Sequence, residues 1–95
     1  MTSSNDLRLA EDSDRGKKAL MILNNPIYQE SLLAIRGELM NAFELTKSDD
    51  SKARDEIWRK LQIVGWFENH IRRVMQTGKL ADETLMQKVK RTMRL

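Results

Sequence analysis

The residue best suited to chemistry in this sequence is its single histidine, His70. On a helix, Trp66 and Arg73 would be its surface neighbours, four residues before it and three residues after it. A catalytic histidine needs a nucleophile or an orienting group within hydrogen-bond reach, and this spacing supplies neither. We therefore interpret His70 as a residue of a helix surface or boundary.

A group of acids is the second candidate for chemistry, and its members are Asp49, Asp50, Asp55 and Glu56. Carboxylates bind hard cations, but this spacing lacks the alternating ligands and the glycine of a calcium loop. Acids at a helix start are better explained as caps. The sequence also lacks a nucleophile elbow and a glycine run for phosphates. We expect no enzymatic activity, no cofactor and no metal.

Aromatic and basic side chains are the candidates for binding a partner. Trp58 and Trp66 are eight residues apart, so on one helix they are rotated by about 80° from each other. They could pack at the edge of a core, or they could anchor a partner, as Trp and Arg do in interface hot spots. With Arg72 and Arg73, they would form a protein-binding patch. Such a mixture also suits single-stranded nucleic acid, although neighbouring acids dilute the positive charge.

The composition indicates one small all-α domain. The chain has 95 residues, one proline, four glycines and no cysteine, so a disulfide framework is excluded. No apolar run approaches the roughly 18 residues of a membrane span, and the polar start of the chain does not resemble a signal peptide. A core of this size is marginal alone. We expect a cytosolic homo-oligomer without a membrane span.

Charge is distributed unevenly along the chain. Residues 1–14 hold one base and four acids, whereas residues 79–95 hold five bases and two acids. The two ends could contact each other between molecules, the basic end could bind a polyanion, or both ends could simply be solvated. We predict a flexible acidic N-terminus over residues 1–14, helical at most from about residue 6, and a single helical domain over residues 15–95.

Helix start and stop signals predict a central antiparallel hairpin. Asn25 and Pro26 open a helix over about 26–46, and a polar turn separates it from a helix over about 51–77 that starts near Asp50 or Ser51. Gly78 is expected to end the second helix. A short helix over 15–23, capped by Asp14, precedes the hairpin.

Apolar residues recur at helical spacing in both hairpin helices. We expect Gly37 and Gly65, near the middle of the two helices, to allow close helix approach. The first stripe comprises Tyr28, Leu32, Ile35, Leu39, Ala42 and Thr46, and the second comprises Ile57, Leu61, Val64, Phe67, Ile71 and Val74.

After Gly78, the sequence predicts a separate basic amphipathic helix. Its apolar face includes Leu85, Met86, Val89 and Met93, and the basic residues outside that face are Lys88, Lys90, Arg91 and Arg94. This helix could pack as the last helix of a bundle, bind a partner protein, or contact nucleic acid or an anionic membrane surface.

The run Ala19-Leu20-Met21-Ile22-Leu23-Asn24-Asn25-Pro26-Ile27-Tyr28-Gln29-Glu30 resembles the start of a group of small helical proteins of tailed bacteriophages and prophages. Two further stretches are similar, namely the acidic turn before Ala53-Arg54-Asp55-Glu56-Ile57-Trp58 and the run Thr77-Gly78-Lys79-Leu80-Ala81. The resemblance covers about residues 15–82.

The resemblance brings no catalytic residues with it. It implies a phage-encoded accessory protein of virion assembly or DNA packaging, which acts through helical faces in the host-cell cytoplasm and can associate with the virion. Its partners would be itself and a phage or host protein. Two alternatives stay open: a nucleic-acid-binding module that uses the basic C-terminal segment, and an inhibitor of a host protein.

Overall fold

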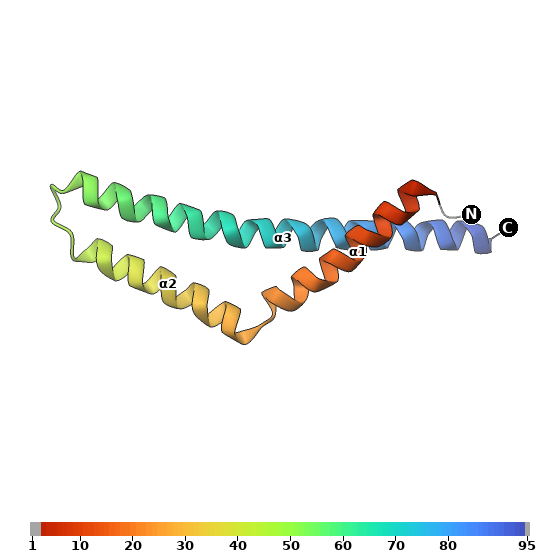
Figure 1. The fold of residues 1–95 in the computed structure, drawn as a ribbon, viewed down its shortest axis with the longest axis horizontal. Helices are drawn as coiled ribbons and strands as arrows, with labels where there is room; N and C mark the ends of the chain where they lie inside the picture. The colour runs from red at the N-terminus through yellow and green to blue at the C-terminus, as the bar shows by residue number, and fades with distance from the viewer. Residues whose placement is uncertain (1–2, 95) are drawn as a thin grey trace. The chain divides into compact units, whose positions relative to one another are not determined.

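The computed structural model describes residues 3–94, and these residues form three helices and no strand. They are α1 (Ser4–Leu23), α2 (Pro26–Glu44) and α3 (Ser51–Met93), shown in Figure 1. The expectation of an all-α protein is confirmed. Contacts divide the chain into two units. Unit 1 combines α1 with α3 from Ile71 onward, and unit 2 runs from Asn24 to His70.

The helix starts in unit 2 are capped as the sequence predicts. The Asn25 side chain accepts hydrogen bonds from the backbone N–H groups of Ile27 (2.8 Å) and Tyr28 (3.2 Å). Asp50 does the same for the N–H of Ala53 at 3.1 Å, so it caps α3. Each cap satisfies helix N–H groups that have no partner within the helix.

The connection between α2 and α3 is held by side chains from both helices. The Thr46 hydroxyl donates to the carbonyl of Phe43 at 2.6 Å and accepts from Nε of Arg54 at 3.0 Å. The guanidinium of Arg54 also lies over the Phe43 ring, 4.7 Å from its centroid, where the ring quadrupole attracts a cation. One arginine therefore joins the end of α2 to the start of α3.

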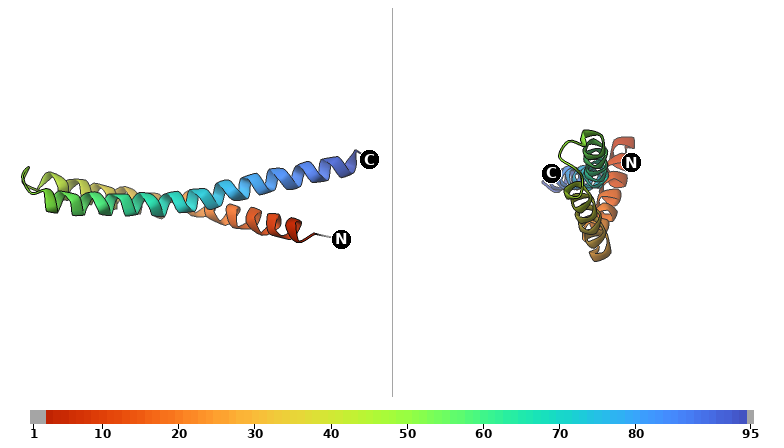
Figure 2. Two further views of the ribbon diagram at one scale, coloured as in Figure 1. Left: turned by 90° about the horizontal axis from the view of Figure 1, so that it is seen from above. Right: turned by 90° about the vertical axis from the view of Figure 1, so that its left-hand side faces the viewer.

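The rest of unit 2 is a thin layer of contacts between α2 and the first part of α3, which lie side by side in Figure 2. Leu32 is buried between them. The Tyr28 and Phe67 rings are 6.5 Å apart and tilted by 45°, and Arg36 forms an ion pair with Glu68 at 2.8 Å. Tyr28 lies near the start of α2 and Phe43 near its end, so contacts with α3 are made at both ends of α2.

Unit 1 is built on a close crossing of α1 and α3 at two glycines, and Figure 1 shows the two helices crossing. A Cβ atom on Gly16 would lie 2.6 Å from the Cα of Gly78. The neighbouring small side chains of Ser13, Ala19 and Ala81 are buried. The Ser13 hydroxyl donates to Asp82 at 3.2 Å. Small residues are needed because any larger side chain would separate the backbones.

Three predictions about the helices are wrong. Gly78 does not end a helix, because α3 continues through it to Met93, so there is no separate basic C-terminal helix. Gly78 has no positive φ, which a C-cap glycine would need. Gly37 and Gly65 do not mark close helix approach, since a Cβ on either would have nothing within 4 Å.

The third wrong prediction concerns the N-terminal helix, which we expected over 15–23 with Asp14 as its cap. It begins at Ser4, where the Ser3 hydroxyl accepts from the N–H of Asp6 at 3.1 Å. Asp14 lies inside the helix and pairs with Lys18 at 2.9 Å. Contacts with α3 explain the longer helix, because a segment with few apolar residues becomes helical when tertiary packing supports it. That residues 15–95 form one domain stays a prediction.

Candidate protein-interaction surface

Neither His70 nor the acidic group, the two features considered for chemistry, is part of a metal-binding cluster within the described residues. Among residues 3–94, no group of three or more His, Asp or Glu side chains could hold a metal ion. His70 is exposed on α3. Asp50, from the acidic group, caps α3.

Both tryptophans are exposed. Trp58 keeps 59% of its surface accessible and Trp66 keeps 65%. A tryptophan packed at the edge of a core would be much less exposed. Within the described residues, packing therefore does not account for either ring. The predicted patch with Arg72 and Arg73 crosses the boundary between the two units, and these arginines are exposed in unit 1.

A groove in unit 2, with a volume of about 320 Å³, runs between α2 and α3. We call it the aromatic groove. Ile35, Ile63 and Phe67, at its rim, are 43%, 57% and 59% exposed. Its lining residues are Tyr28, Ser31, Leu32, Ile35, Ile63, Val64 and Phe67.

The sequence did not predict the aromatic groove as a binding site, although most of its lining residues belong to the two predicted apolar stripes. Ile35 and Phe67 were assigned to the two apolar stripes, and the structure leaves them 43% and 59% exposed. The spacing of the stripes signals an apolar face. It does not tell whether the same chain or another molecule covers that face.

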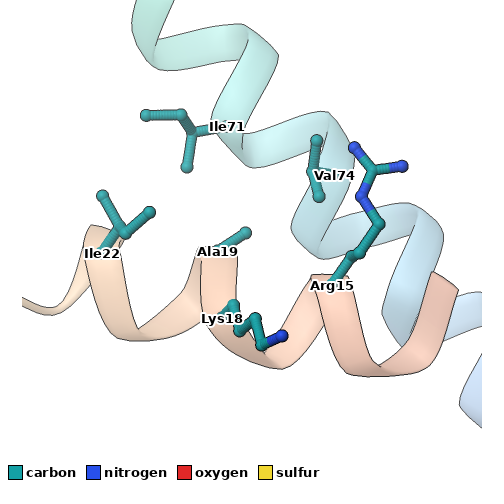
Figure 3. A pocket seen from close by; sticks show the side chains of 6 residues that line it. All are labelled: Arg15, Lys18, Ala19, Ile22, Ile71 and Val74. Carbon is teal, nitrogen blue, oxygen red and sulfur yellow. The ribbon is translucent and has the colours of Figure 1, made fainter. Parts of the chain in front are cut away.

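Unit 1 has a smaller apolar groove of about 210 Å³ beside the glycine crossing. Figure 3 shows Ala19 and Ile22 of α1 facing Ile71 and Val74 of α3 across it. Arg15 and Lys18 complete its lining. The apolar surface is therefore present in both units, and in each it lies along α3.

The basic residues near the end of α3 divide into two groups. Lys88 donates to the Asp6 carboxylate at 2.6 Å, and this hydrogen bond lowers the pKa of Asp6. Lys88 thus serves the contact between α1 and α3. Lys90, Arg91 and Arg94 are exposed. That these four residues bind a partner stays a prediction.

Comparison with models of known families, with curated proteins and with solved structures gives no match. None of the three described helices is both long and apolar enough to cross a membrane. The case for a function therefore depends on the geometry of the exposed surfaces.

Proposed function

We propose that this chain is a non-catalytic, phage-encoded accessory protein of virion assembly or DNA packaging. It acts in the host-cell cytoplasm or on the virion, self-associates, and binds a larger phage component through exposed helical faces. The working surface is the helical hairpin of α2 with the first part of α3. The support from the sequence is the resemblance over about residues 15–82.

The observation that carries this proposal is the exposure of large apolar side chains along regular helices. Trp58 and Trp66 are each more than half exposed, although they lie on α3, a helix with a capped start. Apolar surface in contact with water is unfavourable, so a folded helix that displays it commonly uses it for binding. The exposed tryptophans of α3 are the natural anchors, because Trp dominates interface hot spots.

Affinity capture tests the proposal. The tagged chain is expressed in phage-infected cells beside Trp66→Ala and a Lys52→Ala control, since Lys52 is also exposed on α3. We expect a capsid, portal or packaging protein to co-purify with the parent and the control, and retention to fall at least tenfold in Trp66→Ala. Absence of any phage structural protein, or capture of a host protein alone, would contradict this function and favour the host inhibitor.

A second function, nucleic-acid binding, is favoured by the three exposed bases Lys90, Arg91 and Arg94. Binding to phosphates releases counterions, so the affinity would fall steeply with salt. Replacing all three by glutamine should abolish this salt-dependent binding to a DNA duplex or single strand, whereas Lys17→Gln on α1 should not. If the parent chain shows no binding at low salt, the second function is excluded.

A further inference from the structure

We infer that the aromatic groove is the surface on which a second copy of this chain docks. In the resulting pair, α2 of each copy lies against the 51–70 part of α3 of the other copy, so four helical segments enclose the two grooves. The inference deepens the self-association in the proposed function. It does not depend on the phage partner.

The first argument is the chemistry of the groove. Ile35, Ile63 and Phe67 are at its rim, and Leu32 forms its buried floor. Ile35 and Phe67 belong to the two apolar stripes, whose helical spacing is the pattern by which bundle helices pack together, and Ile63 lies beside the second stripe. Two antiparallel helices cover only one side of each stripe. A second pair of the same kind would cover the other side.

The second argument is exposure within unit 2. Ile35, Ile63 and Phe67 line the groove and are 43%, 57% and 59% exposed, so contacts within the chain leave much of their apolar surface in water. Removing that surface from water is favourable, and a second copy presents the same apolar surface to cover it.

The third argument is charge complementarity across the groove. Glu38 follows Ile35 by three residues on α2, and Lys60 precedes Val64 by four residues on α3, so each flanks the groove on its own helix. Both are exposed. Glu38 lies five residues before Phe43 and Lys60 six residues after Arg54, so the Phe43–Arg54 contact places them at about the same level.

A two-fold axis parallel to the helices would bring Glu38 and Lys60 of the two copies together at two equivalent places. Such an axis keeps every residue at its own level and places α2 of one copy beside α3 of the other. Glu38 of each copy then faces Lys60 of the other copy. A surface that has an acid on one rim and a base on the opposite rim complements itself, which favours a second copy over an unrelated partner.

The test measures the mass of the full chain in solution over a range of concentrations. We expect the parent to be a dimer and Ile63→Glu and Phe67→Glu to be monomers that keep their helical circular-dichroism signal. Leu33→Glu is the matched control, since Leu33 is 75% exposed on α2 and is absent from the groove lining. It should remain a dimer.

Charge reversal tests the orientation. Glu38→Lys and Lys60→Glu should each raise the dimer dissociation constant about tenfold, because each places two like-charged pairs in the interface. The double reversal should restore the parent value. Restoration is the decisive readout, since simple damage to the fold would add up rather than cancel.

The outcomes separate this inference from the proposed function. A parent chain that is monomeric at every concentration would overturn both the self-association and the groove assignment. A dimer that survives Ile63→Glu and Phe67→Glu, or that Leu33→Glu disrupts equally, would overturn the groove assignment alone. A dimer broken by the groove variants without rescue by the double reversal would overturn the pairing of α2 with α3.

Discussion

At the scale of single residues, the glycine crossing decides how α1 meets α3. A Cβ on Gly78 would lie 2.5 Å from the Cα of Gly16 and 2.6 Å from the carbonyl oxygen of Asp12. Both neighbours are backbone atoms, which cannot rotate away as a side chain can. A mid-helix glycine costs about 1 kcal/mol relative to alanine, and here the close contact of the two backbones offsets that cost.

We predict that Gly78→Ala lowers the free energy of unfolding by up to about 2 kcal/mol. Overpacking a close contact costs about 1–3 kcal/mol, and the better helix propensity of alanine returns about 1 kcal/mol. Urea unfolding monitored by circular dichroism would measure the change. Gly16→Ala should lower the free energy of unfolding by a similar amount, because its Cβ would lie 2.6 Å from the Cα of Gly78.

The same substitution at the other two glycines should have the opposite sign. Gly37 and Gly65 lie inside helices, and a Cβ added at either position would have nothing within 4 Å. Alanine there should raise the free energy of unfolding by about 0.5–1 kcal/mol. Stabilisation at Gly78 or destabilisation at Gly37 would contradict the assignment of the crossing.

The Asp6–Lys88 pair makes unit 1 sensitive to acid. The hydrogen bond from Lys88 holds the pKa of Asp6 below its ordinary value, so folding favours the charged carboxylate. Its contribution is complete at neutral pH and is lost as the pH falls through the lowered pKa, below about pH 4. NMR titration should show a lowered Asp6 pKa in the parent and a rise toward the ordinary value in Lys88→Ala, where only the hydrogen bonds with Ser3 still lower the pKa. An unchanged titration curve in that variant would contradict the pairing.

At the scale of helices, the starts of α2 and α3 were predictable because their signals are local. Asn25, Pro26 and Asp50 act on N–H groups within three residues, so their spacing contains the whole interaction. The course of α3 through Gly78 was not predictable in this way. Whether a glycine ends a helix or packs in its interior depends on what contacts it, and Gly16 is distant in the sequence.

We predict that Asn25→Ala lowers the free energy of unfolding by about 1 kcal/mol, since two N–H groups at the start of α2 lose their acceptor. Asn24→Ala is the matched control, because the adjacent Asn24 is exposed and Asn25 supplies the cap. Denaturant unfolding of the two variants beside the parent gives the comparison. Equal losses in both would show that the cap contributes nothing specific.

At the scale of the whole molecule, the unequal charge of the two ends has a use within the chain. α1 places acidic Asp6 beside basic Lys88, so these two opposite charges are paired within the chain and are not both available to a partner.

The candidate site could also be predicted from the sequence only in part. Trp58 and Trp66 could be named from residue type, whereas the aromatic groove depends on which side of each stripe the chain itself covers.

Self-association also predicts how stability responds to concentration. A dimer gains stability by mass action, so the thermal midpoint of the parent should rise as the protein concentration increases. Phe67→Glu, which places a charge in the aromatic groove, should have a midpoint that is independent of concentration, and Leu33→Glu should retain the parent's dependence. Calorimetry over a hundredfold range of concentration would measure all three. A parent midpoint that does not change with concentration would mean that the chain folds as a monomer. The exposed faces of α2 and α3 would then bind a different molecule rather than a second copy.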